Sequence, residues 1–200
     1  NPVSVLANIT GKTRAIMFVG MGGNATNLQE ITEIARSNGL KLILDAAHMG
    51  GTRIGDRHVG FDVDAAVFSF QAVKNLPSAD SGMVCFADME LDKKARELSW
   101  LGINKDTFSR TTKTGGYKWA YDVNELGYKY HGNSIVASLA LVGLKYLDVD
   151  NSLRRKLADR YMFNLNNKYS VKIIIHEIGQ SSRHLFQVLV ENRERVLLYL

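Results

Sequence analysis

The stretch LILDAAHMGG, residues 42–51, has the pattern of a buried strand that ends on an acid. The strand begins at Lys41, and Asp45 then precedes two alanines, His48 and a pair of glycines. Two kinds of ligand could use a carboxylate at the end of a buried strand. One is the ribose of a dinucleotide, and the other is the ring nitrogen of a pyridine. The rest of the chain has to distinguish them.

The elements around this stretch predict a parallel α/β unit. Residues 15–19, AIMFV, read as a buried strand, and a glycine-rich loop follows it. Apolar residues then recur at helical spacing between Leu28 and Ala35, and Asn38-Gly39 closes the helix before the strand KLILD. Strand, loop, helix and strand in this order, with strands apolar on both faces, are typical of a parallel sheet with a right-handed crossover.

Two more strands are predicted, at residues 64–70 and 82–87. The loop between them is too short for a crossover helix, so the second strand can lie antiparallel. Beyond it we expect helices, one irregular connection and two alternating strands, at 88–100 (helix), 103–127 (connection), 133–148 and 150–165 (helices), 171–178 and 184–191 (strands) and 192–200 (helix). The predicted division is a large, incomplete α/β domain with its irregular connection at 1–132. Linking helices and the start of a small α+β domain follow at 133–200.

Composition excludes several classes of protein. With 46% hydrophobic and 22% charged residues the 200-residue chain can build a core, and no apolar run approaches the ~20 residues that cross a bilayer. The net charge of +5 is dispersed, so we expect neither nucleic acid nor membrane as a partner. The single cysteine, Cys85, fits a buried position and a reducing cytoplasm. The chain begins without methionine and stops within a helical pattern, so we expect a fragment of a longer protein.

The dinucleotide hypothesis rests on GMGGNA, residues 20–25. This run matches G-x-G-x-x-G/A between a strand and a helix, and Asp45 would then bind a ribose, as in an NAD-dependent dehydrogenase. The simpler interpretation is a strand-to-helix turn that needs glycines at positive φ. The dinucleotide hypothesis also gives no role to residues further along the chain.

The pyridine hypothesis uses the downstream run FSFQAVKNL, residues 68–76. Lys74 lies there among apolar neighbours (Phe68, Phe70, Val73 and Leu76), and desolvation makes a lysine amine a better nucleophile. Pyridoxal 5'-phosphate (PLP) needs such a lysine and an acid opposite its ring nitrogen. Asp45 supplies the acid, His48 could lie against the ring and Ser69 could bind the phosphate. Taken singly, Lys74 could be solvated and Asp45 could cap a helix.

The loop that contains Asp56, His58, Asp62 and Asp64, with His48 nearby, has the residue types that could bind a metal. The spacing of these residues matches no common ligand motif. We therefore predict solvated turn residues and no metal.

The run from Leu42 to Asn75 resembles the DegT/DnrJ/EryC1/StrS family of PLP-dependent sugar aminotransferases. Three other stretches carry the same resemblance: ITGKTRAI (9–16), LGYKYHGNSIVASLALVGLKYLD (126–148) and SSRHLF (181–186). The resemblance implies the aspartate aminotransferase fold, fold type I, with a mostly parallel sheet in a large α/β domain. It also implies a homodimer, and a longer protein whose N- and C-terminal parts are not in this chain.

The resemblance implies a role for each matching residue. Lys74 would attach the cofactor and transfer a proton, Asp45 would pair with the pyridinium nitrogen, His48 would lean on the ring and Ser69 would bind the phosphate. His184 is similar to a family position near the substrate, although a histidine that lines the core fits equally well. The reaction would move an amino group from an amino acid, typically glutamate, to a keto sugar on a nucleotide.

The chain departs from the family pattern at several positions. Lys129 stands where the family usually has an asparagine that reaches the phosphate of the neighbouring subunit, and His131 and Gly132 replace arginine and methionine. Two other functions remain open within the family. A sugar dehydratase is one, although those proteins carry histidine in place of the lysine. A non-catalytic or regulatory protein is the other.

Overall fold

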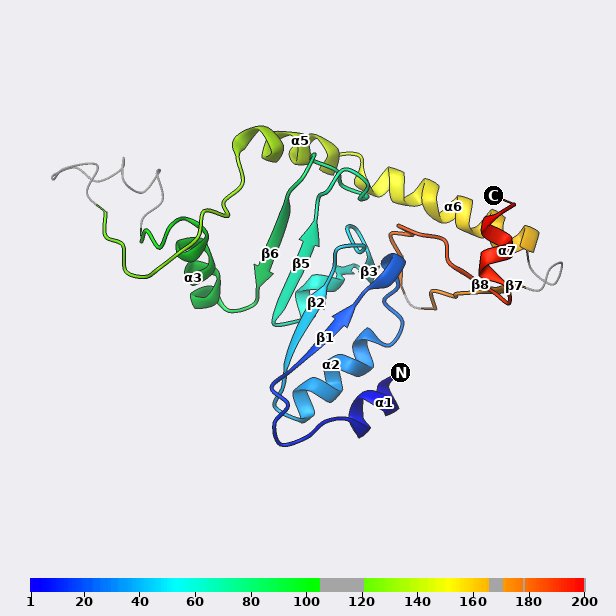
Figure 1. Cartoon of the computed structure of the whole chain (residues 1–200), viewed down its shortest axis with the longest axis horizontal. Helices are drawn as coiled ribbons and strands as arrows, with labels where there is room; N and C mark the ends of the chain where they lie inside the picture. The colour runs from blue at the N-terminus through cyan, green and yellow to red at the C-terminus, as the bar shows by residue number, and fades with distance from the viewer. Residues whose placement is uncertain (105–120, 166–170, 178, 200) are drawn as a thin grey trace.

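The computed structural model describes residues 1–104, 121–165, 171–177 and 179–199. Its centre is a sheet in the order β1-β2-β5-β6 (Figure 1). These strands are β1 (Ala15–Val19), β2 (Lys41–Asp45), β5 (Ala65–Ser69) and β6 (Gly82–Phe86). β1, β2 and β5 are parallel, while β6 pairs antiparallel with β5. The predicted α/β fold and the antiparallel fourth strand are both confirmed.

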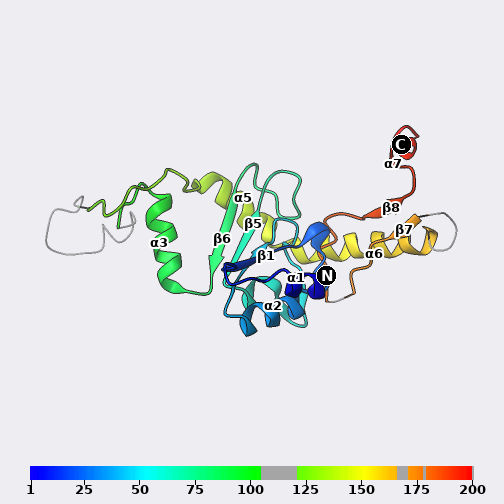
Figure 2. The ribbon, with the colours of Figure 1, turned by 60° about the horizontal axis from the view of Figure 1, so that its bottom comes forward.

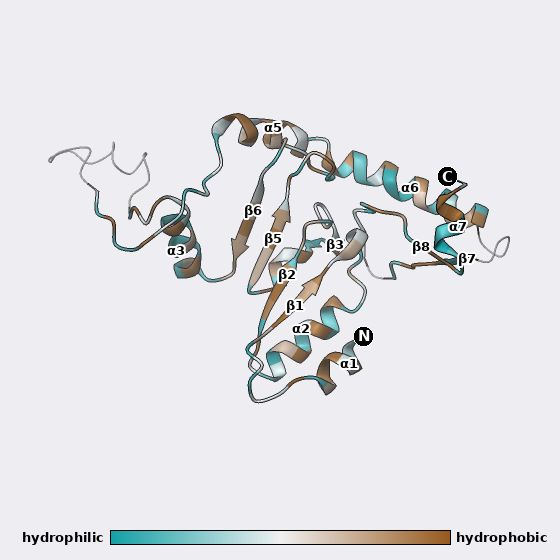
Figure 3. Ribbon diagram, in the orientation of Figure 1, coloured by the Kyte–Doolittle hydropathy of each residue, from teal (hydrophilic) through white to brown (hydrophobic). Residues whose placement is uncertain are grey.

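The helix between β1 and β2 supplies one side of the core. α2 (Leu28–Ser37) packs on β1 and β2, with the short α1 (Pro2–Ala7) beside it (Figure 1). Its buried residues, Leu28, Ile31 and Ala35, lie on one face and meet Leu42 and Leu44 of β2. Gly39, at φ +65°, ends the helix, because this conformation lets the Leu40 N–H reach the Ala35 carbonyl at 2.8 Å. The strands and α5 carry most of the hydrophobic colour in Figure 3.

The loop after β2 is more ordered than a solvated turn. It contains the paired strands β3 (Arg53–Ile54) and β4 (Arg57–His58) and then a 3-10 turn, Val59–Asp62. His58 is part-buried and its ring packs on Phe68, with centroids 5.4 Å apart. The prediction of a solvated residue was therefore wrong for His58.

Among the described residues, three longer helices follow the sheet: α3 (Met89–Ser99), α5 (Ser134–Leu144) and α6 (Leu147–Leu165). α5 ends four residues before the predicted end, because the N–H groups of Lys145 and Tyr146 bond three residues back and tighten the last turn. α6 then starts in a new direction (Figure 1). The predicted domain boundary at 132/133 falls just before α5, whose N-cap is Asn133, and it stays a prediction.

The last part of the chain forms β7 (Val171–Ile173), antiparallel β8 (Val188–Val190) and α7 (Arg193–Leu197). Figure 2 shows these elements beyond one side of the sheet, with α3 on the other. Both strands are shorter than predicted. One more backbone bond, from the Ile174 N–H to the Gln187 carbonyl at 3.2 Å, continues the pair, and beyond it Ile175 and Gln180 bond to the loops after β1 and β2. The described helices include none long and apolar enough to span a membrane.

Candidate active site

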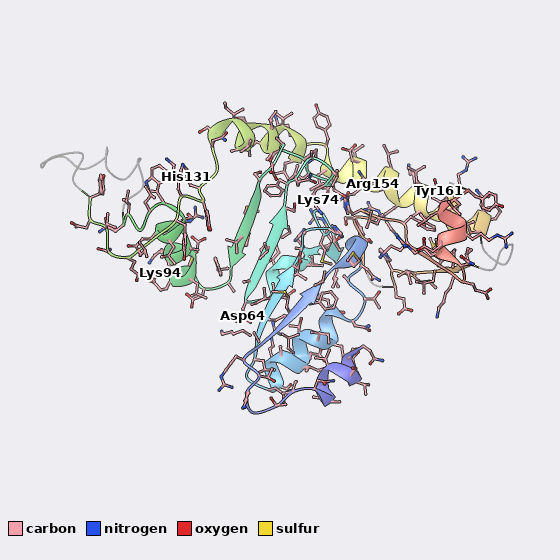
Figure 4. The ribbon with its side chains drawn as sticks, viewed as in Figure 1. Asp64, Lys74, Lys94, His131, Arg154 and Tyr161 are labelled. Carbon is pink, nitrogen blue, oxygen red and sulfur yellow. The ribbon has the colours of Figure 1, made fainter. Side chains whose placement is uncertain are left out.

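The carboxyl ends of β1, β2 and β5 form one edge of the sheet, which we call the carboxyl edge. Asp45 is the last residue of β2 and Ser69 the last of β5, and Lys74 lies in the loop that follows β5. Figure 4 shows Lys74 at this edge, near the part of α6 that carries Arg154. The predicted acid, serine and lysine are therefore on the same edge of one sheet, as the sequence order indicated.

Asp45 is half-buried and its carboxylate is only partly used by the protein. Oδ1 accepts a hydrogen bond from the Ala47 N–H at 3.1 Å. Within the described residues no hydrogen bond reaches Oδ2. One oxygen therefore fixes the side chain, and the other can accept a proton donor from a ligand.

His48 is held by the loop after β1. Its Nδ1 accepts from the Gly22 N–H at 3.2 Å, so the neutral ring carries its proton on Nε2. Burial lowers the pKa of His48, and the positive charge of Lys74 lowers it further, while Asp45 opposes both effects. The imidazole is therefore uncharged at neutral pH.

Lys74 lies on a loop closed at its base. The Phe70 N–H bonds to the Ser81 carbonyl at 2.8 Å, and the hydroxyls of Ser78 and Ser81 are 2.6 Å apart. The Lys74 N–H bonds to the Gln71 carbonyl in a turn that leaves Val73 67% exposed. Of the apolar neighbours predicted for Lys74, Val73 thus faces solvent, while Leu76 is buried.

Ser69 is half-buried and keeps its hydroxyl hydrogen available. Its Oγ accepts a hydrogen bond from the Gln71 N–H at 3.4 Å. A hydroxyl that accepts from the backbone still has one proton to donate. It can therefore donate that proton to an anionic oxygen.

His184 belongs to residues 180–187, which we call the docking segment. This segment brings His184 to the carboxyl edge. Its ring centroid is 4.4 Å from that of His48, and its Nδ1 is 2.7 Å from Oδ1 of Asn75. Burial lowers the pKa of His184 to about 4, and His48, Lys74 and Arg154 add to the effect. The structure thus places His184 beside the predicted site, in contact with His48 and Asn75.

The docking segment binds the loops after β1 and β2 through polar contacts that the sequence did not reveal. Ser182 is fully buried, donates its hydroxyl to the His48 carbonyl at 2.7 Å and its N–H to Thr52 Oγ1 at 3.0 Å. Thr52 Oγ1 and Ser181 Oγ in turn donate to the Gly23 carbonyl at 3.3 and 3.0 Å. The motif SSRHLF contained two of these residues, but no local signal pointed to Thr52.

Lys129 does not join this group. Its backbone forms an isolated antiparallel β-bridge with Trp100, and its Nζ lies 5.5 Å from the centre of the Trp100 ring. The neighbouring His131 packs edge-on against the same ring at 3.9 Å. Figure 4 shows His131 beside α3, across β6 from Lys74.

The glycines after β1 are packed against protein. A Cβ on Gly20 would collide with the side chain of Met49, and one on Gly23 with Ser182 Oγ. Gly22 and Gly23 have φ of +68° and +92°, and their carbonyls accept from the docking segment. A pyrophosphate needs this backbone free, so the dinucleotide hypothesis is not supported by this loop.

The carboxylates near His58 also have other partners or lie apart. Asp64 accepts from Lys41 Nζ at 2.8 Å and from the Leu42 N–H at 2.9 Å, and Asp62 pairs with Arg57 at 3.1 Å. Within the described residues no group of three or more metal-ligating side chains occurs.

A strand-end acid and a loop lysine on a mixed α/β sheet are features of fold-type-I PLP-dependent aminotransferases, and solved aminotransferases match this fold. The chain matches the model of the DegT/DnrJ/EryC1/StrS aminotransferase family over residues 1–199, and it belongs to that family. The dinucleotide hypothesis is therefore set aside.

Individual relatives agree with this assignment. The spore coat polysaccharide biosynthesis protein SpsC of Bacillus subtilis is 33% identical over 195 residues, 97% of this chain and 50% of SpsC. S. venezuelae DesV, solved with a ketimine intermediate, is 27% identical at a TM-score of 0.83, over 98% of this chain and 50% of DesV. The PLP form of Spr1654 from Streptococcus pneumoniae, described as a putative sugar aminotransferase, is 26% identical at a TM-score of 0.78. The match covers 99% of this chain and 54% of Spr1654. The chain thus spans about half the length of these relatives.

The residues at the carboxyl edge fit PLP. The unused Oδ2 of Asp45 suits a protonated ring nitrogen, and the free hydroxyl proton of Ser69 suits a phosphate oxygen. Lys74 would supply the amine, and His48 is held in place by the Gly22 N–H. This donor set contains an acid, a hydroxyl and an amine, which are the groups that the cofactor requires.

Proposed function

We propose that the complete protein is a PLP-dependent aminotransferase. It moves an amino group from an amino acid, with glutamate as the expected donor, to a keto sugar carried on a nucleotide. One observation carries this proposal: Lys74, Asp45 and Ser69 lie on the same sheet edge in a chain of this family. The relatives named for sugar amination and for polysaccharide biosynthesis support the substrate class.

When bound, PLP supplies an aldehyde for the amine and a ring that stabilises negative charge on the substrate carbon. Lys74 would hold the cofactor and carry a proton to and from that carbon. The contact between Ser78 and Ser81 closes the base of its loop and so helps to fix the position of the lysine. Asp45 would hold the proton on the ring nitrogen. His48 would support the ring without adding charge, and Ser69 would donate to the phosphate.

The partner subunit has a place in this proposal. Lys129 lies beside Trp100, away from the Lys74 edge of its own chain. In a homodimer its ammonium would reach the phosphate of the other subunit's cofactor, where a cation can pair with an anion. Mixing Lys74→Ala and Lys129→Ala proteins would then restore one working site per mixed dimer.

The proposed location is the cytoplasm, with soluble nucleotide sugars and amino acids as substrates.

Two rival functions differ at Lys74. A sugar dehydratase of the family would carry histidine there, so Lys74 favours amino transfer. A non-catalytic or regulatory protein would have no use for a reactive amine. Cofactor attachment to Lys74 and turnover of an amino donor separate these possibilities.

The experiment uses the complete protein incubated with PLP. We expect an absorbance band near the edge of the visible range, its loss on addition of glutamate, and a borohydride-fixed cofactor on the peptide that contains Lys74. Lys74→Ala should abolish the fixed adduct, while Lys12→Ala, a change at an exposed lysine, should keep it. A protein that binds NAD and no PLP, or that is labelled equally in both variants, would contradict the proposal.

A further inference from the structure

The side-chain amide of Asn75, the residue after Lys74, is fully hydrogen-bonded. Its Nδ2 lies 2.6 Å from Asn151 Oδ1 and 2.8 Å from the Ser182 carbonyl. Its Oδ1 lies 2.7 Å from Nδ1 of His184. One side chain thus joins the lysine loop, α6 and the docking segment.

The orientation of this amide follows from its partners. A backbone carbonyl can only accept, so the group of Asn75 that faces Ser182 must be the NH₂. Asn151 is fixed in the same way, because its Nδ2 lies 2.9 Å from the Gly50 carbonyl and its Oδ1 therefore faces Asn75. The remaining atom of Asn75, Oδ1, is a carbonyl oxygen and cannot donate.

His184 must then donate from Nδ1. Burial lowers the pKa of His184 to about 4, so the ring is neutral near pH 7 and has only one ring proton. That proton is on Nδ1, and Nε2 keeps its lone pair. Among the described residues no hydrogen bond reaches Nε2.

The ring of His48, tilted by 39° against that of His184, has the opposite tautomer. His48 accepts at Nδ1 from Gly22 and so carries its proton on Nε2. The charged or titratable groups that act on His184 are His48, Lys74 and Arg154, all of which disfavour a positive charge on the ring. A cationic His184 would add a further positive charge to this group.

We propose that Asn75 is a positioning residue for amino transfer: it holds His184 as the uncharged Nδ1–H tautomer, so that Nε2 accepts a hydrogen bond from the bound substrate. This inference rests on the proposed function. Asn75 itself touches neither substrate nor cofactor in this proposal and acts through His184.

The tautomer can be measured without turnover. The complete protein, without added PLP and with ¹⁵N-labelled histidines, gives ring nitrogen shifts that separate protonated from bare nitrogens, and His184→Gln assigns the signals. We expect a protonated Nδ1 and a bare Nε2 at pH 7. A proton on Nε2 in the wild-type protein overturns the proposal, even if no variant folds.

Two variants then separate positioning from general stability. Asn75→Asp places a carboxylate against Nδ1 and should raise the pKa of His184 by about 1–3 units. Asn151→Asp places a carboxylate one hydrogen bond further from the ring, and its shift should be smaller. Equal shifts in the two variants would contradict a specific role for Asn75.

Kinetics connect the tautomer to the reaction. The acid limb of the kcat/KM profile should move upward in Asn75→Asp by the same amount as the His184 titration, and less in Asn151→Asp. An unmoved profile with a shifted titration overturns the positioning role. Borohydride labelling of Lys74 in the same variant keeps the two hypotheses apart, because its presence shows that the proposed function stands when the positioning role fails.

Discussion

Thr52→Val is a sharp test of how the docking segment is held. Thr52 is fully buried, and its hydroxyl accepts the Ser182 N–H and donates to the Gly23 carbonyl. Valine has almost the same shape, so the change removes two hydrogen bonds without opening a cavity. The Gly23 carbonyl keeps its bond from Ser181, but the Ser182 N–H is left buried and unpaired.

The expected cost follows from these two losses. An unsatisfied buried donor costs about 1–3 kcal/mol, and the second bond is worth about 0.5–1.5 kcal/mol. The attached state of the segment should therefore lose roughly 1.5–4.5 kcal/mol relative to its detached state. Since each 1.4 kcal/mol is tenfold in an equilibrium constant, detachment becomes roughly 10- to 1,000-fold more frequent.

Hydrogen–deuterium exchange of the complete protein measures this change. The Gln180 N–H bonds to the Arg53 carbonyl at 2.8 Å and the Leu185 N–H to the Gly22 carbonyl at 3.5 Å, and neither bond is altered by the substitution. Peptides covering these amides should exchange faster by the stated factor, because exchange reports local opening. Thr32→Val is the matched control, since the buried Thr32 hydroxyl only donates to the Leu28 carbonyl within α2.

One exchange result would contradict this role of Thr52. If the docking segment exchanges at the same rate in Thr52→Val as in Thr32→Val, the hydroxyl of Thr52 does not hold it. A general rise in exchange over β1 and β2 would instead indicate damage to the core.

Two further predictions concern stability. Gly51→Ala should lower the melting temperature more than Gly55→Ala: both glycines have positive φ, at +81° and +58°, but only a Cβ on Gly51 would collide with Asn151. Equal losses in a thermal melt would show that strain at positive φ accounts for both. Burial lowers the pKa of His176 and of His184 to about 4 from 6.5, so the unfolded chain binds more protons between these values. Stability should therefore be full above pH 6.5 and fall toward pH 4, and denaturant titrations of a His176→Gln, His184→Gln double variant should show a shallower fall.

Local patterns predicted the sheet and its chemical edge well. The apolar runs AIMFV and KLILD became adjacent parallel strands, and the acid after the second run lies at the carboxyl edge. Lys74 could be placed near Asp45 because the loop after the next parallel strand must return to the same edge. These features depend on residues close together in sequence or on the direction of neighbouring strands.

The docking segment could not be predicted in this way. Its contacts with Thr52 and with the Gly23 carbonyl join residues 130 and 158 positions apart, and serine, threonine and asparagine have the same local signature in a solvated loop. The run VKIIIHEI alternates like a strand, yet only Val171–Ile173 pairs with β8. The glycine pattern at 20–25 was ambiguous for a related reason. Such glycines indicate that the backbone adopts positive φ and that another group packs closely against it. They do not indicate whether that group is a ligand or another part of the chain.

The distance in sequence between Thr52 and Ser182 also has a consequence for synthesis of the protein. The loop after β2 is translated 130 residues before the amide that bonds to it. At about 5–20 residues per second, a ribosome needs roughly 6–26 s to reach that point. During this interval the nascent chain can form the bond from the Thr52 hydroxyl to the Gly23 carbonyl, but the bonds that Ser181 and Ser182 add to these two groups must wait. The lysine and acid of the carboxyl edge are therefore made well before the histidine that completes their surroundings.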